Sequence, residues 1–207
     1  MNVLLTGFGP FPGVPFNPTG PLVRALARQG QPGIRRSAHV FRTSYATVDQ
    51  ELPELIARVE PDALIMFGVA AAIRNLHVET IAHNATNVIL ADASGTVPQS
   101  DMIAGSEVES LRMPVPARRL VNAARSAGVP AALSRDAGRY LCNYLCWRAS
   151  EAAAQPGGPR LAAFIHVPLV DRPRRSRTAR GPMTFDDLVH AGEAIVQAAT
   201  TSARTAR

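Results

Sequence analysis

The sequence predicts an α/β domain in which helices pack on both faces of a mostly parallel, mixed central sheet. Short apolar runs alternate along the chain with segments whose apolar residues have helical spacing. Two of these runs, residues 62–70 and 160–170, are apolar almost throughout, as in strands buried on both faces. We therefore expect a three-layer α/β/α sandwich. A chain of 207 residues, 46% hydrophobic and 18% charged, is expected to form a single domain over residues 1–207.

The first half of the chain predicts three strands and two helices. NVLLTG (2–7) is a short β-type run that ends in Gly, and a loop rich in Gly, Pro and Phe follows it. Residues 18–30 have apolar side chains at helical spacing and a terminal Gly. A strand in residues 37–45 precedes a helix in residues 45–61, which Pro53 is expected to bend or split. The buried run 62–70 is the third strand.

The second half continues the alternation after a long irregular segment. NLHVETIAHN (75–84) has a period of two and predicts one strand. Residues 84–115 are rich in Ser, Gly, Pro and Asp and predict a long excursion, which is uncommon without a purpose. The remaining expected elements are a helix in 114–130, a strand in 131–134, a helix in 138–154, the strand in 160–170, and a C-terminal helix that Thr184 and Asp187 cap.

Charge and hydropathy exclude several classes of partner. The net charge is +6, and the densest basic run, DRPRRSRTARGP (171–182), has five arginines and no aromatic residue. No nucleic-acid-reading motif accompanies this run, so we expect a solvated, mobile loop over 172–180, with binding of phosphate or an acidic ligand as the alternative. No apolar run is long enough to span a membrane, and the N-terminus lacks a signal-peptide pattern, so we expect a cytoplasmic protein.

The only two cysteines, Cys142 and Cys146, lie four residues apart in LSRDAGRYLCNYLCW (133–147). Their spacing on one helix does not suit a disulfide. Cys142 falls in the first turn of the predicted helix, where free N–H groups and partial positive charge favour a reactive thiolate and bind an oxyanion. Cys146 lies one turn deeper and is expected in the core. Taken alone, Cys142 fits a core cysteine as well as a nucleophile.

A cysteine nucleophile needs a base, and His166 is the histidine placed to supply one. It ends a buried strand and precedes VP, so its ring is expected to point out of the carboxyl edge of the sheet. Glu79 interrupts a strand that has little other charge, and it is either the buried partner of a histidine or an exposed residue of an edge strand. The cysteines and histidines do not have zinc-type spacing, so no metal is expected.

Three motifs together resemble the type I pyroglutamyl peptidase (pyrrolidone-carboxylate peptidase) family. SRDAGRYLCN (134–143) is similar to the family's cysteine motif, VLLTGFGPFPGVPFNPT (3–19) to its N-terminal loop, and FIHVP (164–168) to its histidine motif. The resemblance covers nearly the whole chain and implies a phosphorylase/hydrolase-like α/β fold. It also implies a cysteine exopeptidase that removes an N-terminal pyroglutamyl residue from peptides, needs no cofactor, and forms a homo-oligomer, either a tetramer or a dimer.

The resemblance implies a role for each site residue. Cys142 is the nucleophile, His166 the general base and acid, and Glu79 the third member. The positions that match the family's pocket for the pyroglutamyl ring are Phe8, Phe11, Asn17, Val69, Leu90, Tyr140 and Leu141. A neutral lactam ring suits such an aromatic and aliphatic pocket.

The surroundings of Glu79 depart from the family pattern. The changed positions are Val69 for a usual Gln, Ala71 and Ala72 for Gly, His77 for Ser or Thr, Thr80 for Arg or Lys, and Ile89 for an Arg near the catalytic centre. These changes leave two alternatives open. One is a family member with shifted specificity for another small N-acyl or cyclic amide. The other is a catalytically weak homologue that binds peptide ends or acidic partners.

Overall fold

The computed structural model describes residues 1–170 and 183–205, so the predicted basic loop lies outside the described residues. A six-stranded sheet forms the centre of the molecule, with strand order β2-β1-β3-β8-β4-β7. Its strands are β1 (Asn2–Phe8), β2 (Arg35–Phe41), β3 (Ala63–Val69), β4 (Leu76–Glu79), β7 (Ala131–Ser134) and β8 (Leu161–Val167). No helix among the described residues is both long and apolar enough to cross a membrane.

The sheet is mixed, as the sequence predicted. β2, β1, β3 and β8 run parallel to one another, whereas β4 runs antiparallel to β8 and β7 runs parallel to β4. β3 and β8 are buried along their full length at the middle of the sheet, which explains why both are apolar runs. The carboxyl ends of four strands therefore meet at one edge.

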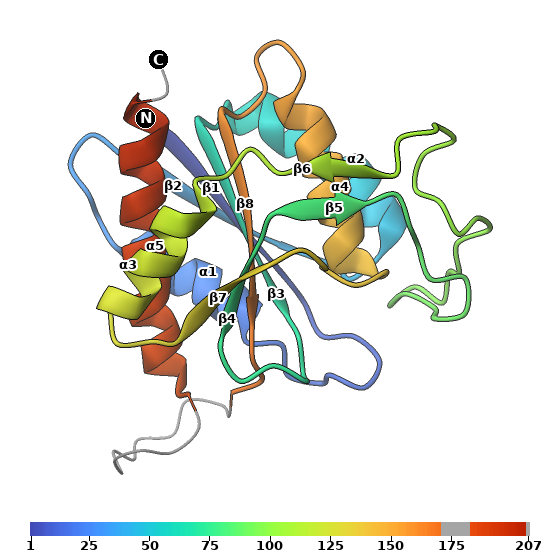
Figure 1. Ribbon diagram of the computed structural model, residues 1–207, viewed down its shortest axis with the longest axis horizontal. Helices are drawn as coiled ribbons and strands as arrows, with labels where there is room; N and C mark the ends of the chain where they lie inside the picture. The colour runs from blue at the N-terminus through green and yellow to red at the C-terminus, as the bar shows by residue number, and fades with distance from the viewer. Residues whose placement is uncertain (171–182, 206–207) are drawn as a thin grey trace.

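Helices cover both faces of this sheet, which gives the predicted three layers (Figure 1). One face packs against α1 (Thr19–Arg28), α3 (Ala117–Ser126) and α5 (Phe185–Thr205). The other face packs against α2 (Tyr45–Val59) and α4 (Leu141–Ala153). Because strand side chains alternate, β8 sends Ile165 toward the first layer and Phe164 toward the second.

Two expectations about helices have clear outcomes. α2 continues through Pro53 without a break. The predicted cap of the C-terminal helix is confirmed: the N–H of Asp187 donates to the Thr184 hydroxyl over 3.1 Å, and the N–H of Thr184 donates to the Asp187 carboxylate over 2.9 Å. This reciprocal pair is a capping box, and it starts α5 at Phe185.

The prediction of one continuous strand over residues 75–84 is wrong. The chain divides at Thr80 into β4 and β5 (Ile81–His83), and β5 pairs with β6 (Ser110–Arg112) in a separate two-stranded ribbon. Thr80 makes the transition, because its N–H donates to Ser134 of the main sheet while its carbonyl accepts from Met113. The excursion that follows thus contains a short strand that the sequence pattern did not indicate.

Candidate active site

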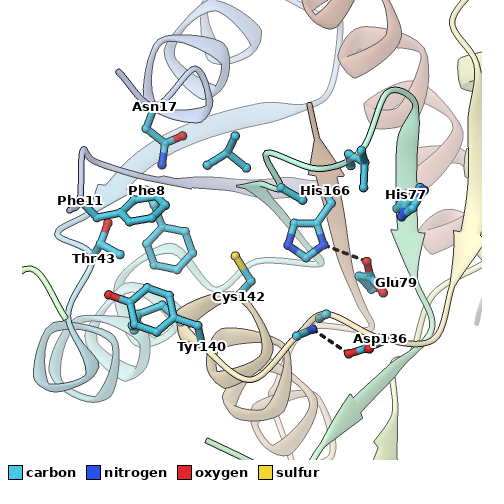
Figure 2. Close-up of a pocket in the computed structure, with 16 residues that line it drawn as sticks. Phe8, Phe11, Asn17, Thr43, His77, Glu79, Asp136, Tyr140, Cys142 and His166 are labelled. Carbon is cyan, nitrogen blue, oxygen red and sulfur yellow. Dashed lines mark hydrogen bonds and ion pairs between the residues drawn. The ribbon is translucent and has the colours of Figure 1, made fainter. Parts of the chain in front are cut away.

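A cavity of about 330 Å³ opens at the carboxyl ends of β1, β3 and β8 (Figure 2). The predicted site residues that line it are Phe8, Phe11, Asn17, Val69, Glu79, Tyr140, Leu141, Cys142 and His166. These residues come from five separate segments of the chain, which converge on one space.

Leu90 is not among the residues that line the cavity. The structure therefore corrects the prediction that Leu90 belongs to the substrate pocket. Its side chain is 53% exposed, and that of Ile89, expected near the catalytic centre, is 84% exposed. The carboxamide oxygen of Asn87 accepts the N–H groups of both residues, over 2.8 Å from Ile89 and 3.0 Å from Leu90. This local turn belongs to the excursion and holds Ile89 and Leu90 outside the cavity.

Cys142 lies in the first turn of α4, as predicted. The helix begins at Leu141, Tyr140 offers it no side-chain cap, and the first helical bond runs from the N–H of Tyr144 to the carbonyl of Tyr140. The N–H groups of Leu141, Cys142 and Asn143 precede that bond and have no acceptor within the helix. The sulfur of Cys142 therefore lies beside donors that have no acceptor within α4, at the positive end of the helix dipole.

Gly68 allows the Cys142 sulfur to pack against the end of β3. A Cβ atom at this position would lie 2.8 Å from Sγ of Cys142 and 2.5 Å from Cζ of Phe164. Both distances are far shorter than ordinary van der Waals contacts, so any side chain here would displace one of the two neighbours. The glycine thus places the thiol over the sheet edge.

His166 and Glu79 form a buried pair. Nδ1 of His166 lies 2.8 Å from Oε1 of Glu79, and the two side chains come from the antiparallel strands β8 and β4. Glu79 is 0% exposed and His166 is 6% exposed. Glu79 is therefore the buried partner of a histidine and not an exposed residue of an edge strand, because β4 lies between β8 and β7.

Charge at the site favours a protonated His166. Burial alone lowers the pKa of this imidazole. The nearby Cys142 sulfur, as an anion and a hydrogen-bond partner, and the Glu79 carboxylate outweigh burial and raise the pKa to about 10. The imidazole beside the Cys142 sulfur is therefore favoured in its protonated form.

Cys146, unlike Cys142, does not line the cavity. Its side chain is fully buried in the layer between α4 and the sheet, and burial raises the pKa of its thiol well above the usual value. The prediction that Cys146 is a core cysteine is confirmed.

The aromatic wall of the cavity comes from two loops. The rings of Phe11 and Tyr140 lie 6.1 Å apart between centroids, and the Tyr140 hydroxyl donates to the carbonyl of Ala91 over 2.9 Å. Asn17 lines the same region, but its amide donates to Gly9 and its carbonyl oxygen accepts from Thr19. Asn17 therefore shapes the loop that carries Phe11.

Several lining residues were not identified from the sequence. They are Thr43, Ala70, Ile73, His77, Asp136, Ala137 and Gly138. A signal existed for His77, because it precedes Glu79 by two residues and so shares a face of the same strand. The sequence around Cys142 also contained Asp136 to Gly138, to which no role was assigned. No three His, Cys, Asp or Glu side chains in residues 1–170 and 183–205 are grouped as metal ligands.

The fold and the site together define a class of protein, the α/β cysteine hydrolases. A thiol at a helix start lies beside a histidine whose other side is held by a buried carboxylate, which is the arrangement that nucleophilic cysteine catalysis requires.

Comparison with known proteins identifies the family. The family model described as pyroglutamyl peptidase matches residues 1–202. The pyrrolidone-carboxylate peptidase of Thermococcus onnurineus is 33% identical over 204 residues, which cover 95% of this chain and 98% of that protein. The enzyme of that name from Thermococcus kodakarensis is 32% identical over 206 residues, covering 93% and 100%.

A solved structure agrees with these relatives. The pyrrolidone carboxyl peptidase from Thermococcus litoralis superposes with a TM-score of 0.89 at 27% identity, covering 100% of this chain and 96% of that one. The chain therefore belongs to the pyroglutamyl peptidase family, a family of cysteine peptidases. The resemblance indicated by the three sequence motifs is confirmed.

Proposed function

We propose that this protein hydrolyses the amide bond after an N-terminal pyroglutamyl residue of peptides, with Cys142, His166 and Glu79 as its catalytic residues. The observation that carries the assignment of residues is the 2.8 Å contact between His166 and Glu79 in the cavity that also exposes Cys142. Membership of the pyroglutamyl peptidase family supports the substrate class.

In the first half of the reaction, the Cys142 thiolate attacks the pyroglutamyl carbonyl carbon. The oxygen that becomes an anion is stabilised by the first N–H groups of α4, which have no acceptor within the helix. His166 gives its proton to the departing nitrogen, so the C–N bond breaks and the peptide leaves as a neutral amine. A thioester between Cys142 and the pyroglutamyl group remains.

In the second half, water replaces the amine. Neutral His166 takes a proton from the water as its oxygen attacks the thioester, and the C–S bond breaks to release pyroglutamate. The Cys142 thiolate and the His166 imidazolium are then restored. Glu79 holds Nδ1 of His166 throughout, which leaves Nε2 to exchange protons at the reacting centre.

The part of the cavity lined by aromatic side chains suits a small uncharged ring. Phe8, Phe11 and Tyr140 present aromatic surface, and Val69 adds an aliphatic wall at the end of β3. None of these side chains carries a charge, and a lactam ring carries none either. Apolar contact with a few backbone hydrogen bonds is how proteins bind small neutral ligands.

Hydrolysis of a chromogenic pyroglutamyl amide by the purified protein tests this proposal. We expect turnover by the wild type and none by Cys142→Ser, while Cys146→Ser, which changes a buried thiol one turn away, serves as the matched control. Absence of turnover by the wild type, or equal turnover by Cys142→Ser, would overturn the proposal.

Val69 motivates a second candidate, a shifted specificity for another small N-acyl or cyclic amide. This residue lines the cavity where the family usually has a glutamine, so one polar contact to the substrate is replaced by an apolar one. A wild type that is inert toward pyroglutamyl amides, but whose Cys142 reacts quickly with a thiol reagent, would favour this candidate.

Association into a homotetramer or dimer also belongs to the proposal. Exposed apolar side chains gather in the excursion, and they are Val88, Ile89, Leu90, Val97, Met102 and Val108. Such a group of side chains is typical of a surface that another protein covers. Light scattering of the purified chain measures the association.

A single domain over residues 1–207 and a cytoplasmic location stay predictions.

A further inference from the structure

The cavity has two ends with different chemistry, and Cys142 lies between them (Figure 2). Phe8 and Phe11 lie on one side of the thiol, in the region proposed to hold the pyroglutamyl ring. His77 and Asp136 lie on the other side, which is also the side of His166 and Glu79. The second end is therefore polar where the first is aromatic.

The direction of the reaction assigns the polar end. If the proposed function is right, on which this inference rests, His166 protonates the nitrogen that leaves, so the departing peptide lies on the His166 side of Cys142. His77 is the direct partner of His166 in the antiparallel register of β4 and β8, and directly opposed side chains project from the same face of a sheet. His77 thus extends the site in the direction of the leaving group.

We infer that this end of the cavity is a subsite for the side chain that follows the pyroglutamyl residue, where Asp136 and His77 favour a long side chain with a cationic tip over an acidic one. Ala137 and Gly138, which follow Asp136 in the chain, also line the cavity and are small enough to leave room for such a side chain.

Asp136 is held so that it presents a carboxylate oxygen. Its Oδ1 accepts the N–H of Gly138 over 2.9 Å, and its own N–H donates to the Ser134 hydroxyl over 3.2 Å. Its second oxygen accepts no hydrogen bond from the residues that the structure describes. A lysine or arginine tip matches this free oxygen, whereas a glutamate in the same place would be repelled.

His77 supplies the wall along which such a side chain would lie. Its ring is partly exposed, and it makes no hydrogen bond within the described ranges of the chain. An imidazole ring offers contact surface to the methylene groups of a long side chain, and little to alanine.

Two arginines near Asp136 in the sequence carry the opposite charge. Arg135 and Arg139 are exposed, and neither lines the cavity. Asp136 is exposed as well, but of these three charges it alone lines the cavity, so its carboxylate is the charge next to a side chain bound there. The carboxylate therefore determines the charge preference at this end.

A comparison of kcat/KM for four pyroglutamyl peptide amides, with Ala, Gln, Lys or Glu after the ring, tests the inference on the full chain. We expect the wild type to prefer Lys over Glu by about fivefold, the scale of a partly exposed charge pair. Asp136→Asn keeps the acceptor for Gly138 but removes the charge, so the Lys/Glu ratio should approach about 1. His77→Ser should lower the Gln/Ala ratio and leave the Lys/Glu ratio unchanged.

The controls are Asp101→Asn and His190→Ser, which change an exposed carboxylate and an exposed imidazole outside the cavity and should leave both ratios as in the wild type. An unchanged Lys/Glu ratio in Asp136→Asn, or an equal loss on all four peptides in both variants, overturns the subsite while the proposed function stands. If the wild type cleaves none of the four peptides, the proposed function fails and the subsite falls with it.

Discussion

Glu79 reaches His166 from a neighbouring antiparallel strand, with Oε1 2.8 Å from Nδ1 across 87 residues of sequence. In the register of β4 and β8, Glu79 faces Phe164 and His77 faces His166, so the contact of Glu79 with His166 is diagonal. The carboxylate therefore approaches the imidazole from within the sheet and not from its open edge. This approach leaves the cavity side of the imidazole free for Cys142 and a substrate.

Glu79→Gln is expected to lower kcat/KM for a pyroglutamyl amide by about 100-fold. The substitution keeps the size of the side chain but removes the charge that helps to raise the pKa of His166. The alkaline limit of activity should therefore move to lower pH, which a profile of kcat/KM against pH measures. Glu54→Gln on the exposed side of α2 is the control. A profile with the same alkaline limit as the wild type contradicts the pairing.

Gly68→Ala is expected to disable the site. The added Cβ would lie 2.8 Å from the Cys142 sulfur, and a nucleophile displaced by about 1 Å loses roughly 100-fold in rate. Overpacking against Phe164 should also lower the free energy of unfolding by about 1–3 kcal/mol. The value of kcat/KM measures the loss of rate, and a urea unfolding curve measures the loss of stability.

Gly105→Ala is the matched control for this substitution, because a Cβ at Gly105 would meet no atom within 4 Å. It should leave activity and stability close to those of the wild type. Full activity in Gly68→Ala would show that the thiol does not depend on the close approach to β3.

Stability should fall with rising pH through the titration of His166. Its pKa is raised from 6.5 to about 10 in the folded chain, so the stabilisation is complete below the unfolded value and is lost as pH rises through the folded value. The free energy of unfolding of the wild type, minus that of His166→Gln, should therefore decrease between pH 6.5 and about 10. Urea unfolding at several pH values measures it, and a constant difference contradicts the raised pKa.

The two thiols should react at very different rates. Cys142 lines the cavity, whereas Cys146 is fully buried and burial raises the pKa of its thiol. Iodoacetamide should modify one thiol in the folded chain and the second only in denaturant, as mass spectrometry would show. Cys142→Ser should abolish the fast modification. Modification of both thiols at one rate in the folded wild type would contradict this assignment.

Local pattern was sufficient to predict much of the fold. β3 and β8 are buried on both faces and so are continuous apolar runs, and the capping box of α5 is a property of four adjacent residues. Cys142 and His166 were found in the same way, one at a helix start and the other at a strand end. These features depend on the chain near each residue.

The rest depends on contacts that are distant in sequence. The pairing of Glu79 with His166 exists because β4 enters the sheet antiparallel beside β8, and no periodicity within residues 75–84 specifies that neighbour or its direction. The same holds for the division at Thr80, which the carbonyl of Ser134 and the N–H of Met113 impose from elsewhere. Leu90 was placed by resemblance, and a local turn at Asn87 holds it outside the cavity.

Asn143, the residue after Cys142, ties the start of α4 to the β5 segment. Its Oδ1 accepts the N–H of His83 over 2.9 Å, and its Nδ2 donates to the carbonyls of His83 and Ala85 over 2.8 and 2.9 Å. The side chain is 0% exposed, so water does not replace these bonds when they are lost. The excursion that begins there also provides the Ala91 carbonyl that holds Tyr140.

Asn143→Ala should therefore lower both stability and activity. Removing the amide leaves the His83 N–H and the Ala85 carbonyl without their partner, while the His83 carbonyl keeps the N–H of Ala85, at a cost of about 2–3 kcal/mol in the free energy of unfolding. Because the loss loosens the segment that holds Tyr140, KM for the pyroglutamyl amide should rise more than kcat falls. Asn122→Ala, on the exposed face of α3, is the control and should change neither quantity. If Asn143→Ala unfolds at the same urea concentration as the wild type, the amide does not anchor the site, and the position of Tyr140 must depend on its ring contacts with Phe11 and Tyr45 instead.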